Sequence, residues 1–223
     1  LNTGMIIGTN QVSGIIGENN NSTVIMSSIY NTRNIRGTDN IGGIVGINQD
    51  SASLTMTNIS NTGMIIGTNH VSGILGANGE LGLFNDDSIV TMSSVYNIGN
   101  ISGSGNSTYI GGIVGSNRNS SKITIKNSLN DGNISGSGTS SIGGIVGGNF
   151  DEFTHISMSS IFNSGNITGD SKVGGIIGTN FRDATITMEN IANNGNISAI
   201  RFIVGGIVGY NVQRSEITIN KFL

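Results

Sequence analysis

The residues best suited to chemistry lie in two short polar segments that follow similar Gly-rich stretches. The first contains two adjacent carboxylates, Asp151 and Glu152, and the second contains Asp183 beside a cation. Two carboxylates on one surface can act as general acid and base on a glycosidic bond, or they can ligate Ca²⁺. An aromatic residue precedes each segment and could offer its ring to a sugar. We therefore single out as partner or glycan contacts Phe150, Asp151, Glu152, Phe181, Arg182 and Asp183.

A simpler interpretation competes with this one, because equivalent segments elsewhere carry Arg118, Lys122 and Arg214. Mixed charge is typical of a solvated turn. The two histidines, His70 and His155, lie in or beside turns with no recurring nucleophile nearby, so we expect solvated turn residues and not bases. The sequence predicts no catalytic residue, no metal site and no cofactor, and the chain is not expected to be an enzyme.

The stretch "NIGGIVGIN" (40–48) raises a second chemical possibility, a loop that cradles a phosphate. Such a loop needs a following helix whose N-terminus faces the phosphate, and a Lys-Ser or Lys-Thr pair. Here another extended segment follows, and the stretch occurs in seven versions. Glycine at the corners of a coil, where the backbone needs positive φ or a close approach, explains this pattern better. We interpret the stretch as structural.

Three motifs recur in the same order along the chain. Their types are N-x-G-N-I-x-G, V/I-G-G-I-V-G-x-N and I-T-M-x-N-I-x-N, as in "NSGNITG" (163–169), "KVGGIIGTN" (172–180) and "ITMENIA" (186–192). Seven such units, spaced by about 30 to 36 residues, fill residues 1–223, and this spacing marks solenoids. We expect a single β-solenoid repeat domain that is a fragment of a longer repetitive protein.

The alternation of apolar and hydroxyl residues in these motifs has the period of a strand, and no stretch shows the period of a helix. Short β-branched segments between Gly, Asn and Ser turns predict an all-β parallel β-helix. Each unit has three extended segments, so we expect about seven coils of three short strands each. With about 4.8 Å between coils, the rod would be on the order of 34 Å long.

Two columns of asparagine should stack along the coils and bond to one another through their side-chain amides. One column consists of Asn19, Asn48, Asn78, Asn117, Asn149, Asn180 and Asn211. The other consists of Asn2, Asn31, Asn61, Asn97, Asn130, Asn163 and Asn193. Since Asn also tolerates left-handed geometry, turn chemistry explains both columns without a ligand.

The two adjacent aliphatic residues after each double glycine, such as Ile44 and Val45, pose a packing problem. A plain strand would point one of them inward and the other outward. Either the glycines kink the chain so that both are buried, or one column forms an exposed stripe for docking. We expect the kink, because glycine flanks the pair on both sides.

Composition excludes several classes of protein. The chain has a formal net charge of −3 and lacks both Cys and Pro, so it has no basic face for nucleic acid and no disulfide framework. No apolar run approaches the roughly 20 residues of a transmembrane helix, and we expect no transmembrane segment. The absence of Pro suits a chain whose backbone donors nearly all enter sheet ladders.

The three motifs together resemble the GLUG-motif repeat of large microbial surface proteins, over essentially the whole chain. The chain differs from many members in having Ile after the double glycine and in having Ser28, Ser94 and Ser160 where those members carry Cys. The resemblance implies an extracellular or cell-surface location and the role of an adhesin or of a non-catalytic stalk. It identifies the architecture and says little about a ligand.

We therefore expect a structural or adhesive rod of an extracellular surface or filament protein. Its partners would be other copies or neighbouring repeats at the open coil ends, and host or environmental glycans or surface proteins. One alternative is a carbohydrate-binding or polysaccharide-acting β-helix. A second is an ice-binding solenoid, suggested by a column of hydroxyls, although charged residues interrupt it. That column consists of Thr55, Thr91, Thr124, Ser157, Thr187 and Thr218.

Overall fold

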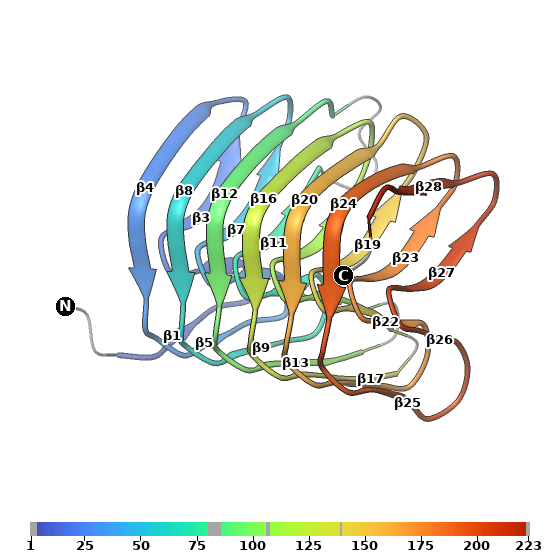
Figure 1. The fold of residues 1–223 in the computed structure, drawn as a ribbon. Helices are drawn as coiled ribbons and strands as arrows, with labels where there is room; N and C mark the ends of the chain where they lie inside the picture. The colour runs from blue at the N-terminus through green and yellow to red at the C-terminus, as the bar shows by residue number, and fades with distance from the viewer. Residues whose placement is uncertain (1–3, 80–85, 106–107, 139, 222–223) are drawn as a thin grey trace.

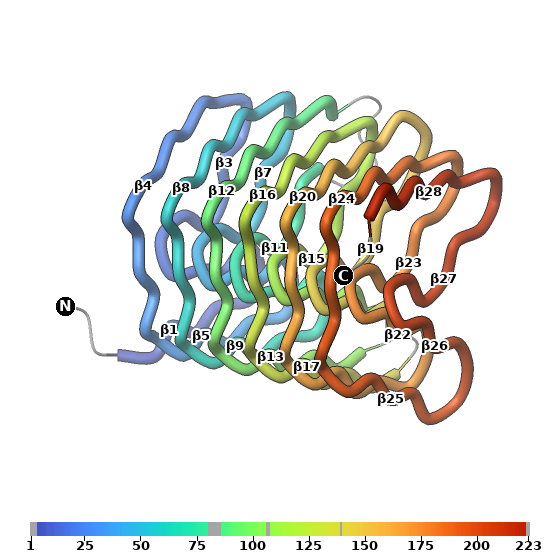
Figure 2. The backbone as a smooth tube through the Cα atoms, viewed as in Figure 1, coloured from blue at the N-terminus to red at the C-terminus, as the bar shows by residue number. Residues whose placement is uncertain are grey.

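The computed structural model describes residues 4–79, 86–105, 108–138 and 140–221, which contain 28 strands and no helix. All strand pairs are parallel, and each strand pairs with its equivalents in the neighbouring repeats (Figure 1). The predicted all-β parallel β-helix of seven coils is therefore confirmed. Figure 2 shows the coils stacked in order from the N-terminal to the C-terminal end.

Four seven-stranded sheets, which we call A to D in their order along each coil, form the walls. Sheet A consists of β1 (Ile6–Ile7), β5 (Ile35–Arg36), β9 (Ile65–Gly67), β13 (Ile101–Ser104), β17 (Ile134–Ser137), β21 (Ile167–Gly169) and β25 (Ile197–Ala199). Sheet B consists of β2 (Asn10–Ser13), β6 (Asp39–Gly42), β10 (Val71–Ser72), β14 (Tyr109–Gly111), β18 (Ser141–Gly143), β22 (Val173–Gly174) and β26 (Val204–Gly205).

The other two sheets follow the double glycine. Sheet C consists of β3 (Ile16–Asn20), β7 (Val45–Gln49), β11 (Leu75–Asn78), β15 (Val114–Asn117), β19 (Val146–Phe150), β23 (Ile177–Phe181) and β27 (Val208–Val212). Sheet D consists of β4 (Thr23–Asn31), β8 (Ser53–Asn61), β12 (Ile89–Asn97), β16 (Lys122–Asn130), β20 (His155–Asn163), β24 (Thr185–Asn193) and β28 (Glu216–Ile219).

Each coil thus has four strands and not the three that we expected from the motifs. The difference arises at the double glycine, where a strand of sheet B ends at the first glycine and a strand of sheet C begins three residues later, as at Gly111 and Val114. The bend is too tight for side chains, since a Cβ on Gly112 would lie 2.1 Å from the carbonyl oxygen of Gly144. The single extended segment that we predicted is therefore two strands in different sheets.

The kink buries both aliphatic residues after the double glycine, as predicted. Ile44 and Val45 are fully buried, and so are their equivalents in coils 3 to 6. Both columns join one apolar core with the inward residues of sheet D. A second, smaller core lies between sheets A and B and contains residues such as Ile65 and Ile110. The exposed stripe that was the alternative is absent from these five coils of the described chain, although Ile15 in the first coil is exposed.

Both predicted asparagine ladders are present. In each described ladder the Nδ2 atom of one Asn donates a hydrogen bond to the Oδ1 atom of the Asn in the following coil, at 2.7 to 2.9 Å. The second Nδ2 hydrogen goes to a nearby backbone carbonyl, as in the bond from Asn61 to Gly63. Asn2, predicted to begin the second ladder, lies outside the described residues. The ladders satisfy a buried polar column that would otherwise destabilise the core.

A left-handed residue occurs within the long strands of sheet D. It is always Ser or Asn, with φ between 50° and 57°, at Ser28, Asn58, Ser94, Asn127, Ser160 and Asn190. Asn is enriched in this region of backbone space, whereas larger side chains are strained there. These residues supply the left-handed geometry that we attributed to the ladder asparagines, none of which has positive φ in the described part. The strands of sheet D accordingly bend along their length (Figure 1).

A search of the described residues for a helix long and apolar enough to cross a bilayer finds none.

Candidate functional site

The six predicted contact residues lie at the turns between sheets C and D in coils 5 and 6, but they do not form one surface. Phe150 is buried, whereas Glu152 and Arg182 are exposed. Arg182 lies 3.7 Å from Asp151, measured from Nη1 to Oδ1. The ring centroids of Phe150 and Phe181 are 6.3 Å apart and the planes are inclined by 59°, so the rings are tilted and not stacked face to face.

A shallow hollow of about 580 Å³ lies over these turns. It is lined by Lys122, Glu152, Phe153, Asp183, Thr185 and Arg214. Within it Arg214 donates two hydrogen bonds of 2.7 Å to the carboxylate of Asp183, and these bonds lower the pKa of that carboxyl. A carboxylate held in a bidentate ion pair is a poor general acid, because its proton affinity is reduced. The hollow therefore resembles a charged, solvated turn more than an acid–base pair.

His155, expected in or beside a turn, is the first residue of β20 and pairs with Lys122 and Thr185, which line this hollow. Its Nδ1 atom lies 2.8 Å from Oγ1 of Thr185 in the next coil. Partial burial, helped by the positive charge of Lys122, lowers the pKa of His155. No third polar group completes a relay in the described residues, and no cluster of three or more His, Cys, Asp or Glu there could hold a metal ion.

The more organised polar cluster is on another face, where strands of sheet C lie against sheet B of the preceding coil. Glycine makes this approach possible, since a Cβ on Gly147 would lie 2.6 Å from the backbone nitrogen of Ile110. Side chains from strands of the two sheets, and from residues next to those strands, meet along this line. We call it the seam, and we call five of its residues the seam cluster: Asp39, His70, Tyr109, Arg118 and Phe150.

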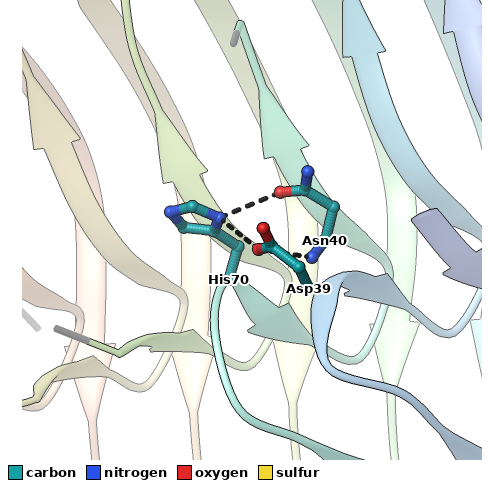
Figure 3. A network of polar contacts seen from close by, with 3 residues as sticks. All are labelled: Asp39, Asn40 and His70. Atoms are coloured by element: carbon teal, nitrogen blue, oxygen red, sulfur yellow. Dashed lines mark hydrogen bonds and ion pairs between the residues drawn. The ribbon is translucent and has the colours of Figure 1, made fainter. Parts of the chain in front are cut away.

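His70 contradicts our expectation of a solvated turn residue, since it is buried in the seam cluster. Its Nδ1 atom lies 3.0 Å from Oδ1 of Asp39 and 2.9 Å from Oδ1 of Asn40 (Figure 3). Both partners present oxygen atoms, so a proton on Nδ1 satisfies them and leaves Nε2 as the unprotonated nitrogen. The ring stacks on Tyr109, with centroids 5.4 Å apart and planes inclined by 7°.

Burial controls the charge state of this histidine. Desolvation lowers the pKa of His70 from its ordinary value of 6.5, and this effect exceeds the opposing hydrogen bond to Asp39. The positive charge of Arg118 acts in the same direction as desolvation. The hydrogen bond from His70 in turn lowers the pKa of Asp39. The cluster therefore consists of a neutral imidazole and an ionised carboxylate at neutral pH.

We expect the stability of the protein to decline as the pH falls below about 6.5, because the unfolded state then binds a proton that folded His70 resists. Above that pH neither state is protonated and the stability is constant with respect to this group. The change His70→Gln should make the decline shallower. Urea unfolding at several pH values between about 8 and 5 measures it. His155→Gln is the comparison, and it should flatten the decline less than His70→Gln, because the pKa of His155 is also lowered but His155 is less buried. An unchanged slope in His70→Gln would contradict the prediction.

Arg118 occupies the centre of the seam cluster. Its guanidinium carbon lies 4.7 Å from the centroid of the Tyr109 ring and 4.8 Å from that of Phe150. These two rings meet edge to face with centroids 4.5 Å apart. The cation thus lies against two aromatic rings, one from sheet B and one from sheet C, an arrangement stabilised by the ring quadrupoles.

Sequence analysis identified Phe150 but missed Asp39 and Tyr109, and it grouped Arg118 with solvated charges. These residues are spread over coils 2, 4 and 5, so no local motif joins them. A signal was present in the repeat alignment, because Asn40, His70 and Tyr109 precede the buried aliphatic residue of sheet B in successive coils. Aligned positions of a solenoid are stacked neighbours, and a column that contains His and Tyr indicates a shared surface.

Comparison with known proteins gave no match to a family model, to a curated protein or to a solved structure. The resemblance to the GLUG-motif repeat therefore stays a prediction from the residues.

Proposed function

We propose that this domain is a stiff structural or adhesive rod of an extracellular or cell-surface protein, with no catalysis of its own. The observation that carries the proposal is the continuous register of all four sheets through seven coils. Every internal coil is hydrogen-bonded to both neighbours along the rod axis, by backbone in the sheets and by amides in the ladders. Such a stack resists bending, because a bend would stretch many parallel bonds at once.

The open ends of the rod are its most natural contacts with other chains. In the first coil β1 to β4 each have a strand on one side only, and the same holds for β25 to β28 in the last coil. An edge strand offers unpaired backbone groups to any strand that approaches it. We propose that a neighbouring repeat or another copy of the chain occupies these ends.

The alternatives expected from the sequence gain less support. The hydroxyl column of sheet D is in register, but Lys126 and Glu189 stand in the adjacent column. A bent, charged face does not favour ice binding. The hollow over the C–D turns does not favour saccharide hydrolysis, because Asp183 is held by Arg214.

Stiffness can be measured directly, because the chain contains no cysteine and introduced ones would be unique labelling sites. Ser27, Ser159 and Glu189 belong to one column of sheet D. Spin labels on Ser27→Cys with Ser159→Cys span four coil steps, about 19 Å, and labels on Ser27→Cys with Glu189→Cys span five, about 24 Å.

We expect each pair to give a single narrow distance distribution in pulsed electron resonance, with the second centred about 4.8 Å beyond the first. Labels placed singly at each site serve as controls for association between molecules. Broad or multiple distributions at either span would contradict a stiff rod.

A further inference from the structure

Arg118 is a buried cation whose charge helps to lower the pKa of Asp39 but which forms no ion pair within 4 Å in the described part of the chain. Only 5% of the residue is exposed, and its Nε atom is buried with no hydrogen-bond acceptor. Buried charges in proteins are ordinarily paired, because removal of an ion from water costs several kcal/mol.

The aromatic rings compensate only part of this cost. Contact with Tyr109 and Phe150 is worth about 0.5 to 2 kcal/mol each, and it leaves the buried Nε–H of the guanidinium without an acceptor. Cation–π contact engages the face of the guanidinium, whereas a carboxylate binds its edge. The two interactions are compatible, and rings that hold the face pre-organise the edge for an anion.

A second cation lies in the same way further along the seam. The Nζ atom of Lys172, in coil 6, is 5.2 Å from the centroid of the Tyr210 ring. Lys172 is partly exposed, and no ion pair between described residues includes it. Arg118 belongs to coil 4, so the two cations are separated by two coil steps, about 9.6 Å along the axis.

We propose that the seam binds an acidic saccharide, with the edge of Arg118 receiving a carboxylate and Lys172 receiving a second one further along the polymer. Partly exposed Tyr109 lies beside Arg118 and supplies a ring against which a sugar can rest. A polymer of uronic acids carries a carboxylate on every sugar, and the rod presents its columns at a regular spacing. The ligand therefore lies parallel to the rod axis.

A saccharide fits the seam better than an acidic peptide. Each strand of sheets B and C in coils 2 to 6 is already paired with a strand on both sides. The backbone of a peptide would find no free N–H or C=O groups there, which are the main source of affinity when a strand is added to a sheet. Recognition at the seam must therefore come from side chains, which suits carboxylates and sugar rings.

The test is binding of fluorescently labelled oligogalacturonate in about 0.15 M salt, with uncharged galactan as the neutral comparison. We expect the wild-type chain to bind the acidic oligomer and not the neutral one. Arg118→Met should weaken binding about tenfold to a hundredfold, the range for loss of hydrogen bonds to a charged group. Arg118→Lys keeps the charge but loses the two-pronged hydrogen bonding of the guanidinium, so its affinity should lie between those of the wild type and Arg118→Met.

The matched control is Arg36→Met, because it removes the same charge from an exposed position in sheet A, outside the seam. That variant should bind as the wild type does. Arg118→Met removes an unpaired buried charge, so its thermal midpoint should not fall, which separates loss of binding from loss of fold.

Four outcomes would overturn the proposal. They are no binding by the wild-type chain, equal binding by Arg118→Met, an equal loss in Arg36→Met, and equally tight, Arg118-dependent binding of polyglutamate, which would identify an acidic peptide as the ligand.

Discussion

Replacing Gly112 by Ala should destabilise the domain by about 4 kcal/mol or more, at the extreme of single substitutions. A Cβ at this position would lie 2.1 Å from the carbonyl oxygen of Gly144 and 2.5 Å from Cγ of Asn130. The first contact is with backbone that is itself bonded in the next coil, and the second is with the asparagine ladder. Neither group can move without breaking hydrogen bonds, so the strain cannot be relieved locally.

The chain provides the control for this substitution. Gly206 is the equivalent second glycine of the last coil, where a Cβ would meet no described atom within 4 Å. Gly206→Ala should therefore destabilise much less than Gly112→Ala. Urea unfolding followed by far-ultraviolet circular dichroism measures both. Equal costs for the two variants would show that contact with the next coil is not the cause of the destabilisation.

Replacing Asn97 by Asp should have the second large effect, about 3 kcal/mol or more at neutral pH. Asn97 is fully buried. Its Nδ2 atom donates to Oδ1 of Asn130 at 2.7 Å and to the carbonyl of Gly99 at 2.9 Å. A carboxylate there would face two acceptors in a low-dielectric core, and both would lose their donor. Its only remaining bond would be the one it accepts from Asn61.

The same geometry predicts an unusual pH dependence for this variant. Burial and the facing oxygens raise the pKa of a carboxyl at this position above the unfolded value of about 3.9. The folded state then binds the proton more tightly, so the deficit relative to the wild type should shrink as the pH falls toward that value. Asn133→Asp is the matched control, because exposed Asn133 only accepts a bond, from the backbone of Asn166, and a carboxylate can do the same. A pH-independent deficit in Asn97→Asp would contradict this account.

Much of the fold could be predicted because each coil of a solenoid repeats the same sequence motifs. The period of two in "ITM" identified the strands, the two asparagine columns identified the ladders, and glycine on both sides of pairs such as Ile44 and Val45 identified the kink. The number of strands per coil was wrong because a motif shows that a segment is extended but not whether it stays in one sheet. The bend depends on the close approach of Gly112 to the next coil, which leaves no room for a Cβ and which no single repeat contains.

The candidate site was harder to predict because its contacts run across the coils. Phe150 and Asp151 are adjacent in sequence, and we placed them together on one surface. The structure turns Phe150 into the seam toward Tyr109, while Asp151 meets Arg182 at the turn. The burial of His70 could not be predicted for the same reason. A histidine in a short loop is expected to be solvated, and only the neighbouring coil covers it.

The direction of the asparagine bonds gives the rod a polarity. Along both ladders each Nδ2 points toward the C-terminal end and each Oδ1 toward the N-terminal end, from Asn19 to Asn211 and from Asn31 to Asn193. Amide dipoles aligned head to tail polarise one another, so their fields add along the axis. One end of the stack is rich in donors and the other in acceptors. A further coil added to either end can therefore continue the ladder hydrogen bonds in one orientation only. The aligned amide dipoles thus give growth or docking along this axis a fixed direction.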